Sequence, residues 1–481
     1  MANSYLPGAQ SPVDAGIPLL QHSSSSVVTG CVDYNGSPVF RSNSGGWKSA
    51  SFIIAVEVAE RFAYYGIANN LITYLTGPLG LSMAVAAENV NAWSGVGSLL
   101  PLLGAFVADS FLGRYRTILL SSAIYILDNL NWVLGFGIPC ISMLTALVIF
   151  LLGTKTYRYS DKRDEKSPFM RIGRVFVLAA KNWRATSSAM GVEEEEASGT
   201  LLHQSSKQFK FLNKALIVTD GSKDYGNICS IGDVEEAKAV LRLVPIWAAS
   251  LVYAIVFAQS PTFFTKQGET MDRTITPNFS VPAASLQCFS SLGIVLSVPI
   301  YDRIFVPLAR ALTRNPAGIT MLQRIGTGIL LSALSMVISA LVEMQRLKTA
   351  REYGLVDKPK AMVPMSVWWL VPQYALLGVS DVFTVVGLQE FFYDQVPDEL
   401  RSVGLSLYLG IFGVGSFLSS LLVSTIEKAT GGNGRDSWFA DNLNRAHLDY
   451  FYWLLAGLSA VQLGAYLYFA KCYIYNRTST L

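Results

Sequence analysis

The chain has 481 residues, of which 51% are hydrophobic and only 15% are charged, and its mean hydropathy is +0.37. A soluble globular chain is usually about one quarter charged, so this composition excludes disordered, collagen-like and disulfide-scaffold chains and argues against one soluble domain. The net charge of +3, from 37 basic and 34 acidic residues, disfavours nucleic acid as a partner, and the five cysteines and three histidines lack metal-site or disulfide spacing.

The first 47 residues are polar and rich in serine, glycine and proline. They lack the basic start and apolar core of a secretory signal peptide. We therefore expect a cytosolic tail over 1–47.

Nine apolar segments are long enough to cross a bilayer, which takes about 20 residues. They are 50–75, 90–108, 132–152, 240–260, 281–300, 325–342, 366–392, 403–426 and 450–470. A tenth apolar run, Thr117–Leu127, would cover roughly 16 Å as a helix, about half of the hydrocarbon core. The sequence predicts an all-α integral membrane protein with about ten spans.

The positive-inside rule orients these spans. The segment 153–239 is rich in lysine and arginine and is predicted to be cytosolic, whereas 76–89 has neither residue and is predicted to lie outside. To return to the inside before 153, the chain must use Thr117–Leu127 and 132–152 as two arms, joined by a turn at Asp128–Asn131.

Two connecting segments have features of their own. Pro168–Arg184 spaces its apolar residues for an amphipathic helix, which we expect to lie along the inner leaflet. The loop 343–365 falls outside although it carries five basic residues, which is an exception to the positive-inside rule.

The predicted organisation has five parts. These are a tail at 1–47, an N-terminal helical bundle at 48–152, a cytosolic linker with the amphipathic helix at 153–239, a C-terminal six-helix bundle at 240–475 and a cytosolic tail at 476–481.

The first predicted span contains three ionisable residues, Glu57, Glu60 and Arg61. Spacings of three and four residues put them on one helical face. Ionisable groups inside a bilayer are costly and usually line a water-filled cavity. Arg61 can hold a carboxylate ionised, and uptake of a proton changes the charge of the cluster, which is what coupling proton movement to a second solute requires. The alternative is a static salt bridge between helices.

Acidic and basic residues also stand together at two predicted inner span ends. Asp109, Arg114 and Arg116 follow the second span, and Asp302 and Arg303 occupy the corresponding loop of the second half. We expect these charges to act as a conformational latch between moving helices. The alternative is an ordinary positive-inside loop.

Polar and aromatic residues inside other spans are candidates for a substrate cavity. Asp381 lies near the middle of its span, and Tyr64, Tyr65 and Tyr253 are aromatic candidates that could instead be packing residues. Glu390 is nine residues after Asp381, which is 900° of helical rotation, so the two face opposite ways. We expect Glu390 to have a local partner instead.

Several of these segments resemble the plant nitrate and peptide transporter family, a branch of the proton-coupled oligopeptide transporters. The similar motifs are Glu57–Gly66, Asp109–Arg116, Val281–Ser285, Pro299–Arg303 and Gly387–Pro397. The resemblance implies a major facilitator fold of two six-helix bundles and proton-driven symport. It also implies that Glu57, Glu60 and Arg61 form the coupling cluster and that Asp381 is the acidic position of the tenth helix.

The chain departs from the family pattern in its first half. Leu127 joins directly to Asp128, where the resemblance implies a fourth and a fifth helix. The missing fourth helix normally supplies a lysine that partners the first-helix glutamates, and no residue here matches it. Loss of two helices preserves the orientation of everything downstream. The resemblance thus implies a major facilitator fold with an incomplete first bundle.

Two functions follow from these observations. One is a symporter that carries protons with a small solute or anion, such as nitrate or a di- or tripeptide, by alternating access in the plasma or vacuolar membrane. The alternative is a truncated, transport-impaired variant that acts as a regulatory partner of a full-length relative. An enzyme is disfavoured because no nucleophile–base pair or metal cluster is present, and no cofactor is expected.

Overall fold

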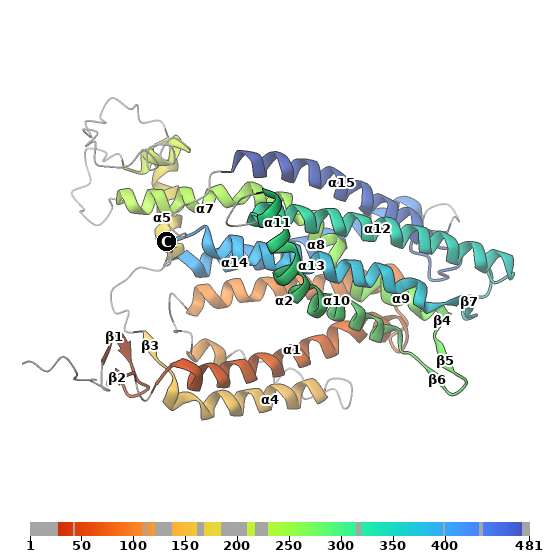
Figure 1. Cartoon of the computed structure of the whole chain (residues 1–481), viewed down its shortest axis with the longest axis horizontal. Helices are drawn as coiled ribbons and strands as arrows, with labels where there is room; N and C mark the ends of the chain where they lie inside the picture. The colour runs from red at the N-terminus through yellow and green to blue at the C-terminus, as the bar shows by residue number, and fades with distance from the viewer. Residues whose placement is uncertain are drawn as a thin grey trace, which may run out of the picture. The chain divides into compact units, whose positions relative to one another are not determined.

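The computed structural model consists mainly of long helices (Figure 1). It describes residues 27–41, 44–108, 111, 113, 115–120, 137–160, 168–183, 209–216, 229–313, 319–397, 400–431 and 436–473. The chain divides into two compact units, one formed by Met1–Phe62 with Cys140–Glu165 and the other by Ala63–Pro139 with Lys166–Leu481.

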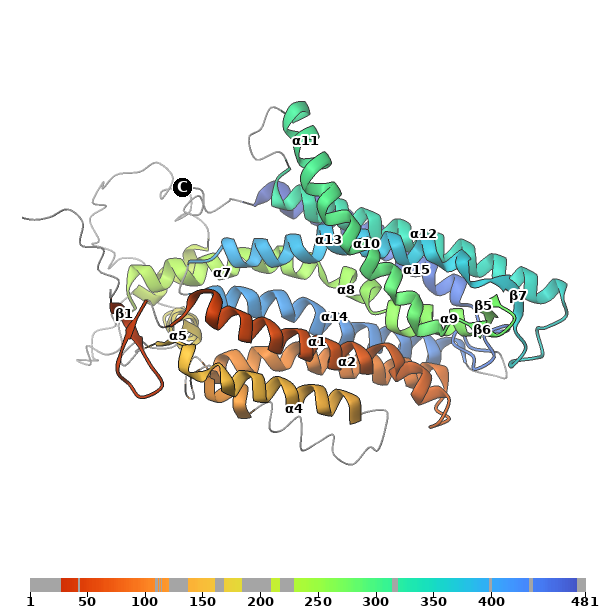
Figure 2. The same cartoon turned by 60° about the horizontal axis from the view of Figure 1, so that its bottom comes forward.

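The first unit contains the beginning of helix α1 (Gly46–Thr76) and most of α4 (Gly137–Leu152), which lie side by side (Figure 2). The hydroxyl of Ser142 on α4 donates to the carbonyl oxygen of Ala59 on α1 at 3.0 Å. The short η2 (Thr154–Thr156) follows α4.

A small antiparallel sheet completes this unit. Its strands are β1 (Val27–Val32), β2 (Pro38–Phe40) and β3 (Tyr159–Ser160), in the order β2-β1-β3. The expected tail thus contains an ordered hairpin. Its turn is held by Asp33, whose Oδ1 accepts the backbone N–H groups of residues 35 and 37.

The second unit contains the remaining helices. Each of the nine predicted spans contains a helix, so the apolar segments were read correctly. The long ones are α2 (Met83–Val107), α7 (Ile231–Ala249), α10 (Gln287–Ile300), α12 (Met321–Glu352), α13 (Val371–Asp394), α14 (Arg401–Thr430) and α15 (Leu448–Cys472). Within the described residues six helices are long and apolar enough to cross a membrane, or seven if one bent pair is counted as a single span.

Short elements connect these helices. They are α5 (Pro168–Lys181), η4 (Lys210–Leu216), α8 (Leu251–Phe257), η6 (Ser260–Phe264), α9 (Thr265–Glu269), β4 (Met271–Asp272), β5 (Thr274–Thr276), β6 (Phe279–Ser280), η7 (Ala283–Leu286), η8 (Tyr301–Phe305), α11 (Val306–Thr313), β7 (Val363–Ser366) and η9 (Val367–Leu370). Helix α5 confirms the helical part of the prediction for 168–184, and it ends at Lys181. Strand β4 pairs with β7, and β5 pairs with β6.

The bent span runs from α7 to α9 and turns by 46° between Ala249 and Leu251. The hydroxyl of Ser250 donates to the carbonyl oxygen of Ile246 at 2.8 Å, a back-bond that bends helices. A π-helical turn, η6, then follows. The last helical segment of this span, α9, is therefore a separate short piece.

Small residues let the helices of the second unit approach closely, as is usual for membrane helices. A stripe of buried serines on α12, at 332, 335 and 339, faces its neighbours, and Ser335 donates to the carbonyl oxygen of Gln373 on α13 at 2.9 Å. A Cβ added to Gly378 on α13 would meet the backbone of Ser290 on α10. Helices α12, α13 and α15 run side by side through this core (Figure 1).

Candidate functional site

The charge cluster of α1 is formed as its spacing predicts. The Nε of Arg61 lies 2.9 Å from a carboxylate oxygen of Glu57 and 3.5 Å from one of Glu60. The exposed fractions of the three side chains are 57% for Arg61, 60% for Glu57 and 39% for Glu60. The structure therefore brings these residues together and leaves both carboxylates accessible for proton exchange.

Aromatic side chains follow the cluster along α1. The ring of Tyr64 stacks on that of Trp93 with centroids 5.2 Å apart, and its hydroxyl lies 3.4 Å from the hydroxyl of Ser94. Tyr65 meets Tyr64 edge to face at 5.4 Å and is half exposed. Tyr64 is thus fixed against α2, whereas Tyr65 keeps an open face.

The structure places two cavity candidates, Asp381 and Tyr253, in direct contact. The hydroxyl of Tyr253 on α8 donates to Oδ1 of Asp381 on α13. Tyr253 is fully buried and Asp381 is 7% exposed. A buried carboxylate needs such a donor, because an unpartnered charge away from water is costly.

Glu390, on the same helix, has the local partner that its position predicts. Nη1 of Arg324 on α12 donates to its carboxylate at 3.1 Å. The guanidinium of Arg324 also covers the ring of Tyr301 at 4.6 Å from the centroid. Glu390 is therefore occupied in holding α12 and α13 together.

The predicted latch stays a prediction. Asp109 and Arg114 lie outside the described residues, and Arg116 is exposed. Asp302 and Arg303 are exposed on η8, and neither forms an ion pair with any residue that the structure describes. The geometry thus neither joins these charges nor separates them from a partner.

A cluster that the sequence did not reveal joins α1 to α9, at the end of the helices that the sequence places outside. Lys266 and Glu269 form an ion pair on α9. Nζ of Lys266 donates to the hydroxyl of Thr76 at 2.9 Å, and the hydroxyl of Thr73 donates to Glu269. The spacing of Lys266 and Glu269 signals their pairing, but only the fold shows the threonines.

Two further contacts tie α2 to later helices of the second unit. The amide of Asn91 donates to the hydroxyl of Ser419 on α14 at 3.0 Å, and Gln259 donates to the same hydroxyl at 3.3 Å. The backbone N–H of Met83 donates to Asp441 at 2.8 Å. Helix α2 therefore packs along α14 from its first residue onward (Figure 2).

A second missed feature is an ion pair between Glu343 and Arg346, with Nη2 of Arg346 2.6 Å from the carboxylate and both side chains fully buried. The apolar window predicts a span that ends at residue 342, whereas α12 continues to Glu352. Arg346 is thus a neutralised helix residue and adds no free charge to the loop 343–365. This reduces the exception to the positive-inside rule.

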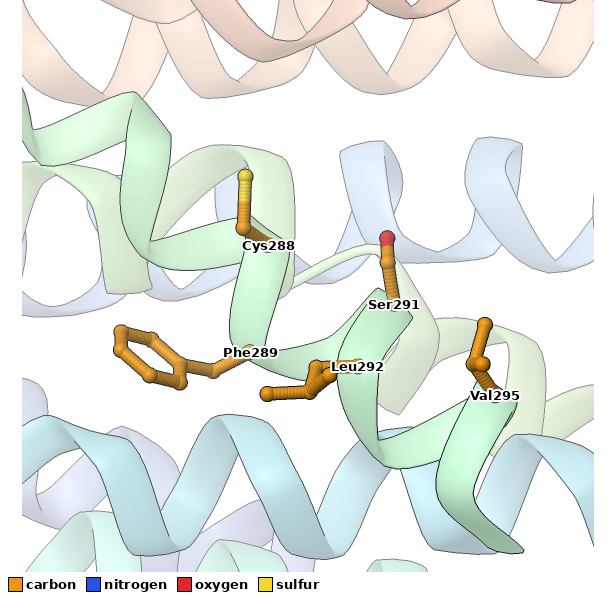
Figure 3. A pocket seen from close by; sticks show the side chains of 5 residues that line it. All are labelled: Cys288, Phe289, Ser291, Leu292 and Val295. Carbon is orange, nitrogen blue, oxygen red and sulfur yellow. The ribbon is translucent and has the colours of Figure 1, made fainter.

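One open hollow of about 350 Å³ lies on α10. It is lined by Cys288, Phe289, Ser291, Leu292 and Val295, and the first of these side chains points to the same side of the helix as Ser291 (Figure 3). The lining is apolar and holds no charged group. This hollow therefore lacks the polar contacts that would orient a substrate.

Comparisons with known proteins agree with the residues just described. Residues 115–439 match the family model described as the POT family. Protein NRT1/PTR FAMILY 5.10 of Arabidopsis thaliana is 54% identical, over 97% of this chain and 98% of that protein, and Protein NRT1/PTR FAMILY 5.14 of the same plant is 50% identical, over 94% and 97%. The crystal structure of an auto-inhibited POT family peptide transporter shares the fold, with a TM-score of 0.67 and 19% identity over 89% of this chain and 98% of that one.

The alignment with the 5.10 protein is longer than this chain. It spans 563 positions, whereas 97% of 481 residues is about 467, so about 96 positions have no residue here. Across all of these comparisons the similarity runs through nearly the whole chain and the solved fold is that of a transporter. The chain therefore belongs to the POT family, whose members are membrane transporters and not enzymes.

Proposed function

We propose that this protein is a symporter that couples protons to the movement of a small solute, nitrate or a di- or tripeptide, across the plasma or vacuolar membrane. The names of its relatives and the titles of the similar crystal structures support these substrate classes. The observation that carries the proposal is the accessible cluster of Glu57, Glu60 and Arg61 on α1.

The cluster has the charge balance that coupling requires. Two ionised carboxylates and one guanidinium leave one negative charge, and a single proton neutralises it. Because Arg61 reaches both carboxylates, the proton that one of them takes up weakens one contact while the other remains. The energy of the cluster therefore depends on protonation, and a conformation that favours the neutral cluster becomes more populated in acid.

The contacts at the outer end support alternating access. Lys266 and Glu269 on α9, together with Asp441, bind α1 and the start of α2, so the described conformer is closed at the end predicted to be outside. A hydrogen bond contributes roughly 0.5–1.5 kcal/mol net, so these three sum to a few kcal/mol. A ligand needs about 5.5 kcal/mol of differential affinity to reverse a two-state equilibrium, so such a closure can be opened in each transport cycle.

The second candidate is a non-transporting partner of a full-length relative. It is favoured by the roughly 96 alignment positions that this chain lacks. Two spans of about 20 residues each, with their connections, fit within that length. Without them the first bundle is incomplete, and no residue matches the lysine that the resemblance implies for the fourth helix.

Uptake measurements in oocytes separate the two candidates. A symporter takes up labelled nitrate or a dipeptide faster as the external pH falls. The same assay on a chain in which the homologous segment of the 5.10 protein is inserted between Leu127 and Asp128 gives the reference. Uptake by the restored chain alone would favour the non-transporting partner, and uptake by neither would contradict both the substrate class and the coupling.

The buried pair of Asp381 and Tyr253 gives a prediction about transport. We expect Asp381→Asn to lower the rate of uptake by about tenfold or more, because a hydrogen bond to a charged group contributes roughly 1.5–3 kcal/mol. The matched control is Glu390→Gln, the same change of acid to amide on the other face of α13, with a local partner in Arg324. Equal losses in the two variants, at equal amounts of protein in the membrane, would remove Asp381 from the transport pathway.

A further inference from the structure

The end of α12 holds an unusually complete charge site. Nε and Nη2 of Arg346 donate to the two carboxylate oxygens of Glu343 at 2.8 and 2.6 Å. Its other donors reach the carbonyl oxygen of Leu443 at 2.7 Å, the side chain of Asn444 at 2.8 Å and the hydroxyl of Thr270 at 3.3 Å. All five N–H groups of the guanidinium are thereby satisfied.

The same site reaches α9 through a glutamine. Nε2 of Gln267 donates to a carboxylate oxygen of Glu343 at 2.8 Å, and Oε1 of Gln267 accepts from Gln373 on α13 at 3.2 Å. The four side chains Gln267, Glu343, Arg346 and Gln373 have no exposed surface. Helix α9 is therefore attached to α12 and α13 by a continuous buried network.

Helix α9 carries two different kinds of contact on its five residues. Lys266 and Glu269 are partly exposed and hold the threonines of α1. Gln267 lies between them in sequence and holds Glu343. The α1 contacts can be replaced by water when they open, whereas separating α9 from α12 would leave buried polar groups without partners.

We propose that Gln267, Glu343 and Arg346 are positioning residues that fix α9 to α12, so that the outer end opens by movement of α1 away from α9. The inference rests on the proposed alternating access and adds which of the two contacts of α9 breaks. Helix α9 then acts as a stationary face, and its Lys266–Glu269 pair is presented in one place throughout the cycle.

Spin-label distance measurements on the purified full chain test this. The five native cysteines are replaced by serine, and one pair of labels is placed at Ile275→Cys and Tyr353→Cys, which are exposed positions after α9 and at the end of α12. We expect a single narrow distance distribution for this pair. Adding Gln267→Met should widen it or add a second maximum. A broad distribution before that substitution would overturn the proposal.

The matched control is Gln345→Met, which makes the same change on an exposed residue between Glu343 and Arg346. We expect it to leave the distribution unchanged, and an effect equal to that of Gln267→Met would overturn the proposal. If Gln267→Met does not fold, the distribution of the unaltered pair still decides. Because the measurement uses no substrate and no proton gradient, it stands apart from the uptake assays, which can fail while this result holds.

Discussion

Replacing Arg346 by leucine should destabilise the folded protein by about 3–5 kcal/mol, which is the cost of breaking a buried ion pair by removing one partner. Glu343 would keep its charge in a site with no exposed surface, and Asn444 and the carbonyl of Leu443 would lose their donor. The measurement is the thermal unfolding midpoint of the purified protein in detergent, together with the amount that reaches the membrane.

Two controls give this result its meaning. Lys348→Leu removes a basic residue from the same helix, but its side chain is 67% exposed and lies 4.0 Å from Glu352, so we expect a change within about 0.5 kcal/mol. The double variant Glu343→Leu with Arg346→Leu should recover part of the loss, because apolar replacement of a whole buried pair is often tolerated. A loss from Lys348→Leu as large as that from Arg346→Leu would contradict the assignment.

The position of this pair explains what sequence patterns can and cannot predict. Hydropathy located every described span, because apolar length is a local property. The same average ended the ninth segment at 342, since it counts Glu343 and Arg346 as two polar residues and cannot detect that they neutralise each other at a spacing of three. The 46° bend at Ser250 was also missed, because it depends on one hydroxyl and not on composition.

The candidate site divides in the same way. Glu57, Glu60 and Arg61 were predicted as a group because contacts within one helix follow from spacing alone. Asp381 and Tyr253 were predicted singly, but their contact joins positions 128 residues apart, and no local pattern encodes it. The threonine contacts of Lys266 and Glu269 belong to the same class of long-range pairing.

The proton-coupling role gives the second large effect. In the double variant Glu57→Gln with Glu60→Gln, we expect uptake to lose its dependence on a proton gradient, because the cluster then has no group that changes charge. One proton moved down a gradient of one pH unit releases about 1.4 kcal/mol, which supports about tenfold accumulation of a solute. The variant should therefore bring its substrate only to equilibrium, whereas the unaltered chain concentrates it.

The outcome depends on comparing accumulation with entry. A variant that merely misfolds loses both, so the initial rate of substrate entry without a gradient must be measured beside the final ratio across the membrane. Glu88→Gln on α2 is the control, since it removes an acidic group that forms no ion pair with the part of the chain that the structure describes. Should the double variant still concentrate substrate tenfold per pH unit, the proton must bind elsewhere, and Asp381 becomes the next carboxylate to replace. If entry persists while accumulation disappears, the cluster on α1 is what links the proton to the solute.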